Sequence, residues 1–154
     1  MKTRAHRILG TVAVAGLFAT TASHANAPAG RYTTPSSGLV YDTKTKLTWQ
    51  ATFATNVSWG TAAGQTAAIC SALGAGWRVP TVKELQSIVD YSLPSSTSVG
   101  MIDSKFFPNT PGFEFWSSTL EAGNSANGWY VTFYDGSTAT NGTDGNTWDL
   151  RCVK

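Results

Sequence analysis

Histidine and cysteine are scarce in this chain. Its 154 residues include two histidines, His6 and His24, and two cysteines, Cys70 and Cys152. Beyond residue 24 the sequence therefore offers no base for a Ser-His-Asp type of catalytic site. Two isolated cysteines without a neighbouring histidine also make a poor zinc site. We therefore expect neither histidine-based catalysis nor a zinc centre in the main part of the chain.

Charge is also scarce, since Asp, Glu, Lys and Arg together make up 13% of the residues. Lys2, Arg4 and Arg7 are three of the eleven basic residues, so eight remain against nine acidic residues in the rest of the chain. A nearly neutral domain lacks the basic patch that nucleic-acid binding requires. Nucleic acid is therefore not an expected partner.

The N-terminal residues have the three-part layout of a secretory signal peptide. The basic start is followed by the uncharged, mostly apolar run 8–20 and then by small residues up to Ala27. The apolar run is shorter than the roughly 20 residues that span a bilayer, which argues against the alternative of a membrane anchor. We expect cleavage after Ala25, with Ala27 as the alternative site, so that residues 1–25 are the signal peptide. The mature protein is then secreted or periplasmic, with no membrane span.

The rest of the chain has the length of one domain. Residues 26–37, rich in Pro, Ala, Thr and Ser, indicate a flexible, exposed lead-in to a domain over 38–154. In an exported protein an even pair of cysteines is typical of a disulfide, so we expect Cys70 and Cys152 to be joined. Two free thiols are the alternative.

Two helices are predicted from apolar spacing and capping residues. Ser58 is a suitable N-cap for a helix that runs through Cys70 to Leu73 and ends at the glycines that follow, with Cys70 on its inward face. Thr81 and Glu84 have the spacing of a capping box for a second helix, which ends before Leu93-Pro94.

Short strands make up the remaining regular structure. Residues 38–49 read as a hairpin around a polar turn, and residues 92–112 as an irregular segment whose Phe106-Phe107 pair enters the core. Strands are expected at 113–117, 129–133 and 147–153, with a turn-rich loop at 134–146. In the last strand we expect Trp148, Leu150 and Cys152 to point inward and Asp149, Arg151 and Val153 outward. The order predicts an α+β domain with antiparallel strands.

The motifs together resemble the Lcl C-terminal domain family. The matching segments occur in order over nearly all of the expected mature chain: Gly38-Leu39-Val40-Tyr41-Asp42 with Leu47-Thr48-Trp49, Cys70, Gly76-Trp77-Arg78-Val79-Pro80-Thr81 with Glu84-Leu85, Phe107-Pro108-Asn109-Thr110, Phe115-Trp116-Ser117-Ser118, Trp129 with Val131 and Phe133, and Arg151-Cys152-Val153-Lys154.

The resemblance implies a C-type-lectin-like fold related to that of formylglycine-generating enzymes. In the collagen-like adhesin that gives the family its name, this domain is associated with binding of sulfated polysaccharide and with trimer formation. The present chain departs from that protein in two respects. No Gly-X-Y tract precedes the domain, and its nearly neutral charge does not suit a sulfated ligand.

These observations favour an extracytoplasmic ligand-binding module for glycan or polysaccharide, or for surface adhesion. The alternative is a protein-recognition or structural domain with variable C-terminal loops. An enzyme is the third option, but Asp135, Asp144 and Asp149 show no spacing typical of paired catalytic carboxylates. We expect no cofactor apart from the calcium considered below, and the oligomeric state stays open.

A sugar site needs a flat aromatic face beside amides or carboxylates. The C-terminal third offers such residues, and the candidates are Trp129, Tyr130, Tyr134, Asp135, Asn141, Asp144 and Asn146. The turn 141–146 also carries oxygen ligands of the kind that calcium prefers, but an ordinary polar turn is the interpretation we favour. Trp49, Trp77 and Trp116 read as core residues, and Arg78 as one half of an internal ion pair or a ligand contact.

Overall fold

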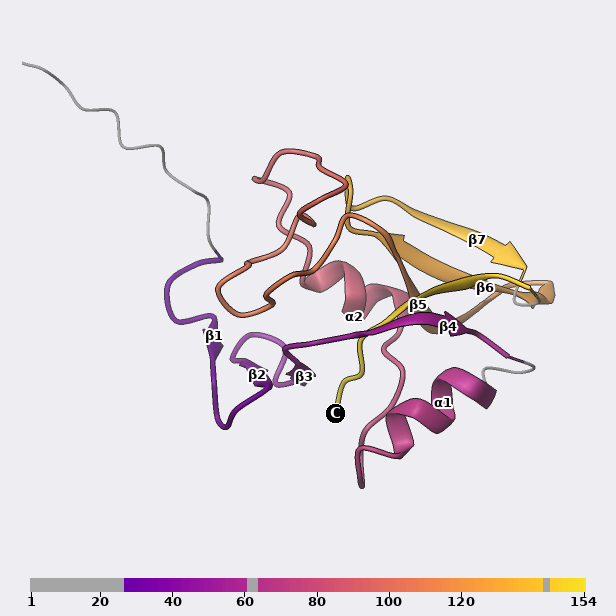
Figure 1. Ribbon diagram of the computed structural model, residues 1–154, viewed down its shortest axis with the longest axis horizontal. Helices are drawn as coiled ribbons and strands as arrows, with labels where there is room; N and C mark the ends of the chain where they lie inside the picture. Colours follow the sequence, from indigo (N-terminus) through magenta and orange to yellow (C-terminus); the bar gives the residue numbers. More distant parts are fainter. Residues whose placement is uncertain (1–26, 61–63, 143–144) are drawn as a thin grey trace, which may run out of the picture.

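The computed structural model describes residues 27–60, 64–142 and 145–154 (Figure 1). The predicted signal peptide lies outside these residues. Within them, no helix has the length and apolar character needed to cross a membrane.

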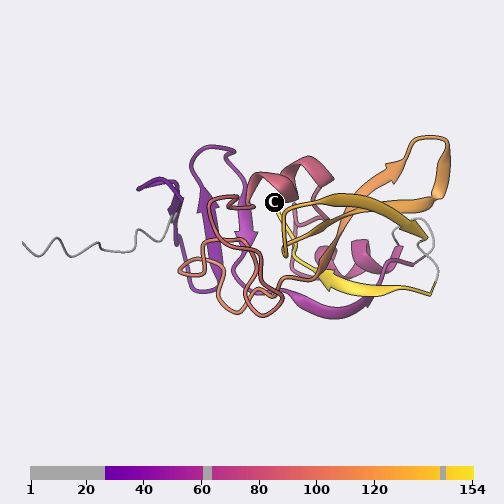
Figure 2. The same ribbon diagram turned by 90° about the horizontal axis from the view of Figure 1, so that it is seen from above.

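The described chain forms two sheets and two helices. The three-stranded sheet has the order β1 (Tyr32–Thr33), β2 (Leu39–Asp42), β3 (Thr48–Gln50). The five-stranded sheet has the order β4 (Ala54–Ser58), β8 (Thr147–Leu150), β5 (Glu114–Glu121), β6 (Asn124–Thr132), β7 (Thr138–Gly142). Helix α1 (Gly64–Ser71) lies beside β4, and α2 (Val82–Ser87) packs on β5 and β6. The three-stranded sheet and the β5–β6 hairpin lie toward opposite ends of the molecule (Figures 1 and 2). The predicted α+β class is confirmed.

The predicted N-terminal hairpin is confirmed, with Val40 opposite Trp49 in the β2–β3 pair. The segment before it differs from the expected exposed lead-in. Residues 28–30 and 33–37 are exposed, but Tyr32 pairs with Asp42 through β1 and is only 5% exposed. The Arg31 guanidinium lies 2.9 Å from the Asp42 carboxylate. This contact and the desolvated ring of Tyr32 attach the segment to the domain.

The second helix is confirmed at its start. Thr81 is the N-cap, its hydroxyl accepts the Glu84 N–H at 3.3 Å, and the Glu84 carboxylate accepts the Thr81 N–H at 2.7 Å. The helix is shorter than predicted, because it ends at Ser87 and Ile88 is its C-cap. Leu85, Ile88 and Val89 are buried in the core as the apolar spacing indicated.

The predicted start of the first helix is wrong. Ser58 ends strand β4, and the described part of α1 begins at Gly64. Trp59 is a buried anchor for the sheet, since its indole N–H donates to the Ser117 carbonyl at 3.0 Å. At the other end the helix stops at Ser71, and Leu73, expected on the buried face, is 44% exposed. Cys70 is fully buried, as predicted.

Two further expectations about the strands are corrected. The loop expected at 134–146 contains β7, which pairs with β6 in regular antiparallel register from Val131↔Thr138 to Asn127↔Gly142. The sheet is also mixed, because β5 and β8 pair in parallel at Phe115↔Asp149. The segment 92–112 has no helix or strand, as predicted, and its Phe107 is fully buried.

The core consists of two clusters on the two faces of the large sheet. Neighbouring residues of one strand point to opposite faces, and here Phe115 and Val131 belong to one cluster while Trp116 and Tyr130 belong to the other. The first cluster is completed by α2 and the three-stranded sheet, and the second by Cys70 of α1 and by Trp77 and Val79. Both faces are therefore covered.

Because both faces of the large sheet are covered, the inward and outward alternation expected for residues 147–153 is wrong. Asp149, Arg151 and Val153 were expected to point outward, yet all three are buried. The side chain of Arg151 donates to the carbonyls of residues 50, 51 and 52 at 2.7, 2.6 and 3.2 Å and to the Thr110 hydroxyl at 2.6 Å. The rings of Phe53, Phe107 and Phe115 surround its guanidinium at 4.9 to 5.8 Å. Arg151 thus joins the β3–β4 connection, the irregular segment and the sheet.

Candidate functional site

A groove of about 540 Å³ opens between α1 and the segment that leads into α2. Its lining residues are Ala67, Ser71, Trp77, Arg78, Val79, Thr81 and Ser118. We call it the Trp77 groove. Its volume lies within the range of about 300–1,000 Å³ that is typical of small-molecule sites.

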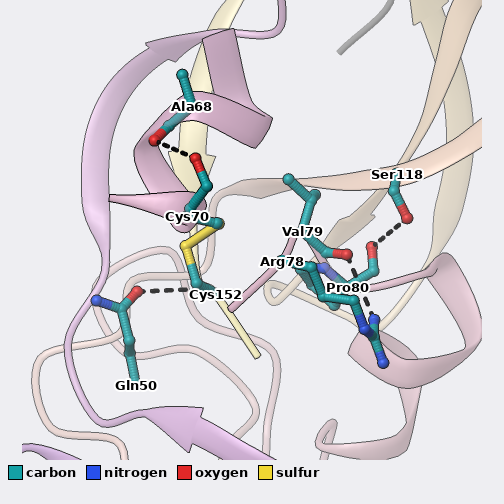
Figure 3. The surroundings of a disulfide bond; sticks show 9 residues. Gln50, Ala68, Cys70, Arg78, Val79, Pro80, Ser118 and Cys152 are labelled. Atoms are coloured by element: carbon teal, nitrogen blue, oxygen red, sulfur yellow. Dashed lines mark hydrogen bonds between the residues drawn. A yellow bond between two sulfur atoms is a disulfide. The ribbon is translucent and has the colours of Figure 1, made fainter. Parts of the chain in front are cut away.

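The α1 wall of the groove is fixed by the disulfide. Cys70 and Cys152 are bonded, with their Cα atoms 5.5 Å apart, which confirms the predicted bridge. Both cysteines are buried. Ala67 and Ser71, which lie in α1 with Cys70, are exposed and line the groove. Next to the bridge, the Gln50 side chain accepts the Cys152 N–H at 3.1 Å (Figure 3). The sulfur–sulfur bond therefore ties α1 to the segment that follows β8.

The opposite wall is the extended segment 77–81. Arg78 and Val153 exchange two backbone hydrogen bonds of 2.8 and 2.9 Å. The Pro80 carbonyl accepts both the N–H of Ser118 at 2.8 Å and its hydroxyl at 3.3 Å (Figure 3). These bonds place Ser118 of β5 at the base of the segment, so that one helix, one extended segment and one strand meet at the groove.

Arg78 forms an ion pair with Glu84, as one of its two readings predicted. Its Nη1 and Nη2 atoms lie 2.8 and 2.7 Å from the two carboxylate oxygens. The pair is at the surface and joins the segment to α2, which makes it less internal than expected. The hydrogen bonds from Arg78 hold the pKa of the Glu84 carboxyl below its usual range, and the bond from the Thr81 N–H adds to this. Glu84 therefore stays charged and engaged at neutral pH.

The groove combines a flat apolar surface with a polar rim. Trp77 is half-buried and Val79 is buried beneath the surface. Ser71, Thr81 and Ser118 supply hydroxyls, and each of these can accept a further hydrogen bond. The Lys154 ammonium lies 5.1 Å from the centroid of the Trp77 ring but does not line the groove. Such a set suits a ligand with both C–H faces and hydroxyl groups.

Of the seven residues proposed from the sequence, the six that the structure describes lie on both faces of β6 and at the two ends of β7. Tyr130 faces the second core cluster, where its ring lies 4.3 Å from that of Trp148. Trp129 precedes it in β6 and so points to the opposite face of the sheet. Both aromatic side chains are half-buried.

The polar candidates are separated along β7. Tyr134 and Asp135 lie in the turn before this strand, and the Asp135 carboxylate accepts the Ser137 N–H at 2.9 Å. Asn141 lies near its other end, where Asn146 donates to the Gly142 carbonyl at 2.9 Å. Asp144 lies outside the described residues. No group of three His, Cys, Asp or Glu side chains that could hold a metal is found in the described part of the chain.

Sequence reasoning missed the groove because it assigned Trp77 to the core. The local signal was present, since Trp77 and Arg78 directly precede the predicted capping box of α2. The sequence around Trp77 does not show where α1 lies, because the position of α1 depends on the disulfide between Cys70 and Cys152. Only that long-range contact turns the segment into one wall of a groove.

Asp149 lies in β8, outside the Trp77 groove, and faces the bulge in the neighbouring strand β4. Its carboxylate accepts the backbone N–H of Asn56, which has a φ of 53° where the β4–β8 register shifts. Burial raises the pKa of Asp149 from 3.8 to about 6, and the neighbouring charge of Glu114 acts in the same direction. The ionised carboxylate therefore costs the folded state free energy at neutral pH.

Replacing Asp149 with Asn should remove this cost and keep the acceptor for Asn56. Because the folded pKa lies above the unfolded one, the contribution of Asp149 to stability is present below about pH 4 and is lost as the pH rises through about 6. Between these values the parent should lose roughly 1–3 kcal/mol relative to Asp149→Asn. Urea unfolding of both proteins at pH 4, 5, 6 and 7 measures the difference, and parallel pH profiles would contradict the expectation.

Comparison with known proteins provides the family. No curated protein matches the chain at the threshold applied. A family model of the Lcl C-terminal domain matches residues 38–154, which contain both helices, the disulfide and the Trp77 groove. The match covers more than half of the chain, from the first strand of the hairpin to the last residue. The chain therefore belongs to the Lcl C-terminal domain family.

Proposed function

We propose that this domain is an extracytoplasmic glycan-binding module and that the Trp77 groove holds a sugar ring. The observation that carries the proposal is the lining of the groove: one half-exposed indole surrounded by three hydroxyls and a guanidinium. The proposal includes export by the N-terminal signal and a C-type-lectin-like scaffold.

Sugar rings are recognised by two kinds of contact. Their C–H faces pack on aromatic rings, and their hydroxyls bond to polar groups that are held in place. Trp77 supplies the first kind. Ser71, Thr81 and Ser118 supply the second, and each is already oriented by a bond to the backbone: Ser71 to the Ala68 carbonyl at 3.1 Å, Thr81 from the Glu84 N–H, and Ser118 to the Pro80 carbonyl. A rigid site of this kind loses little conformational freedom on binding.

A protein-recognition role is the second candidate, and one surface favours it. Tyr91, Val99, Phe113 and Tyr134 are each more than 40% exposed. Their segments are hydrogen-bonded to one another: the Tyr91 hydroxyl donates to the Gly136 carbonyl, and the Phe113 carbonyl accepts from Phe133. This surface is distinct from the lining of the Trp77 groove.

A glycan array with the purified mature protein tests the proposal. Trp77→Ala should weaken binding of the sugars identified by at least about tenfold, because a buried aromatic contact contributes about 1.4 kcal/mol or more. Ala67→Phe is the second variant. It fills the groove from the exposed side of α1 and should have the same effect with the core intact.

The double variant Tyr134→Ala, Asp135→Ala is the matched control, since both residues are exposed and lie outside the groove. Near-parental binding by the control, with loss in both groove variants, supports the proposal. Loss only in the control would move the site to the β6–β7 turn. The absence of any sugar signal from the parent would contradict a glycan-binding function. Circular dichroism of each variant confirms that it is folded.

A further inference from the structure

We propose that the Trp77 groove selects an uncharged sugar, and that Glu84 is the residue that determines this specificity. The inference rests on the proposed glycan-binding function and adds the chemical class of the ligand. It is carried by the geometry around Arg78, the one charged residue among the described residues that line the groove.

The Nη1 and Nη2 end of the Arg78 guanidinium is already occupied by a carboxylate of the chain itself. Binding of a carboxylate or sulfate typically uses two parallel N–H groups of a guanidinium. In this structure those two groups, on Nη1 and Nη2, are directed at the two oxygens of Glu84 at 2.8 and 2.7 Å. The third Glu84 contact, from the Thr81 N–H at 2.7 Å, fixes the carboxylate at the start of α2. A sugar carboxylate that takes this end of the guanidinium would have to displace Glu84 from both partners.

The pair also balances the charge of the groove. The positive charge of Arg78 is neutralised by Glu84, and in the described part of the chain no acidic or second basic side chain lines the groove. An anionic sugar there would lie close to the Glu84 carboxylate, while the charge of Arg78 is already balanced, which is unfavourable. The Lys154 ammonium lies against the Trp77 ring, 5.1 Å from its centroid, and is not among the residues that line the groove.

The groups that remain suit hydroxyl ligands. A guanidinium has five N–H groups, and Arg78 uses three of them on Glu84 and the Val79 carbonyl. The other two, on Nε and Nη2, make no hydrogen bond to a described residue and can donate to sugar hydroxyls. The serine and threonine hydroxyls of the rim are acceptors for the hydroxyl hydrogens of a ligand. Donors and acceptors are therefore both present without net charge.

Glu84→Gln tests the charge of Glu84 separately from its role in the capping box of α2. Glutamine at this position also completes a capping box, because its side-chain oxygen can accept the Thr81 N–H. The variant removes the negative charge and leaves Arg78 with an uncompensated positive charge. Asp135→Asn is the matched control, because it makes the same change in net charge at an exposed turn and keeps the acceptor for Ser137.

The experiment compares oligosaccharides that differ only at C6. Hexamers of glucose, galactose and mannose are paired with hexamers of the corresponding uronic acids, and binding is measured by titration calorimetry at low and high salt. The parent and Asp135→Asn should bind a neutral hexamer at least about tenfold more tightly than its uronate, with little effect of salt. Glu84→Gln should shift this ratio by about tenfold toward the uronate, and the gain should fall at high salt.

Three other outcomes would each contradict a different part of the proposal. A parent that prefers the uronates overturns the specificity while leaving the glycan-binding function intact. A neutral-to-uronate ratio that is unchanged in Glu84→Gln, with circular dichroism confirming the fold, overturns the role of Glu84. Failure of every hexamer to bind the parent contradicts the proposed function itself and this inference with it.

Discussion

Arg151→Met should lower the free energy of unfolding by roughly 3–5 kcal/mol, because Arg151 is a fully buried cation with four acceptors. Methionine fills most of the volume but donates nothing to the carbonyls of residues 50–52 or to Thr110. Those acceptors lie among aromatic rings and cannot all reach water. Urea unfolding at pH 7 measures the loss.

Arg151→Lys tests the origin of this loss. Lysine keeps the charge, but its ammonium is one point and cannot reach both the carbonyl group and Thr110. Its stability should fall between those of the parent and of the methionine variant. Lys44→Met at an exposed position is the control and should change stability by less than about 0.5 kcal/mol. A methionine variant as stable as the parent would show that the aromatic cage alone supports this part of the core.

Loss of the disulfide should have a similar effect. The Cys70→Ser, Cys152→Ser variant opens a loop with a sequence separation of 82 residues, and the chain-entropy model gives roughly 4–5 kcal/mol for a loop of that size. The bridge also confines α1, whose last described turn carries Cys70. We therefore expect the midpoint of urea unfolding to fall, and hydrogen exchange in residues 64–71 to accelerate more than in α2.

The parent treated with a reductant under unfolding conditions, and then refolded with its thiols blocked, is the matching control. It should reproduce the variant if the bridge itself is responsible. Unchanged exchange in α1, together with an unchanged midpoint, would contradict the assigned role. Two reactive thiols in the untreated, unfolded parent would mean that the bridge does not form in the protein.

Local sequence signals predicted the parts of the fold that depend on neighbouring residues. The start of α2 is encoded by Thr81 and Glu84, which bond to each other across three positions. The β2–β3 hairpin is encoded by two apolar runs around a polar turn. The disulfide was predicted from the number of cysteines and from the expected export. This prediction does not depend on how far apart Cys70 and Cys152 lie in the sequence.

Elements that depend on distant partners were missed. Strand β4 reads Ala-Thr-Asn-Val-Ser, and its bulge at Asn56 interrupts the alternation that marks a strand. Strand β7 reads Thr-Ala-Thr-Asn-Gly, which has the composition of a turn and becomes a strand because β6 supplies its hydrogen bonds. Arg151 resembled a surface residue because nothing near it in sequence shows that the segment 92–112 covers it.

The candidate site was predicted less well for the same reason. Aromatic and amide residues of the C-terminal third are close in sequence, but the two faces of β6 and the length of β7 separate them. The Trp77 groove is assembled from residues 67–81 and Ser118. From the sequence, Thr81 was assigned as an N-cap and Arg78 as half of an ion pair, but Trp77 was assigned to the core and the meeting of these segments was not predicted.

The pairing of residues 152–154 has a consequence for the order of folding. Val153 bridges both Trp49 and Arg78, and Lys154 exchanges backbone hydrogen bonds with Thr48. The contacts between the two sheets are therefore completed by the part of the domain that leaves the ribosome last. Until then, the hairpin and α2 can form only as separate pieces. The domain should complete its folding only after residues 152–154 have been synthesised, at the slow rates typical of sheets with distant partners.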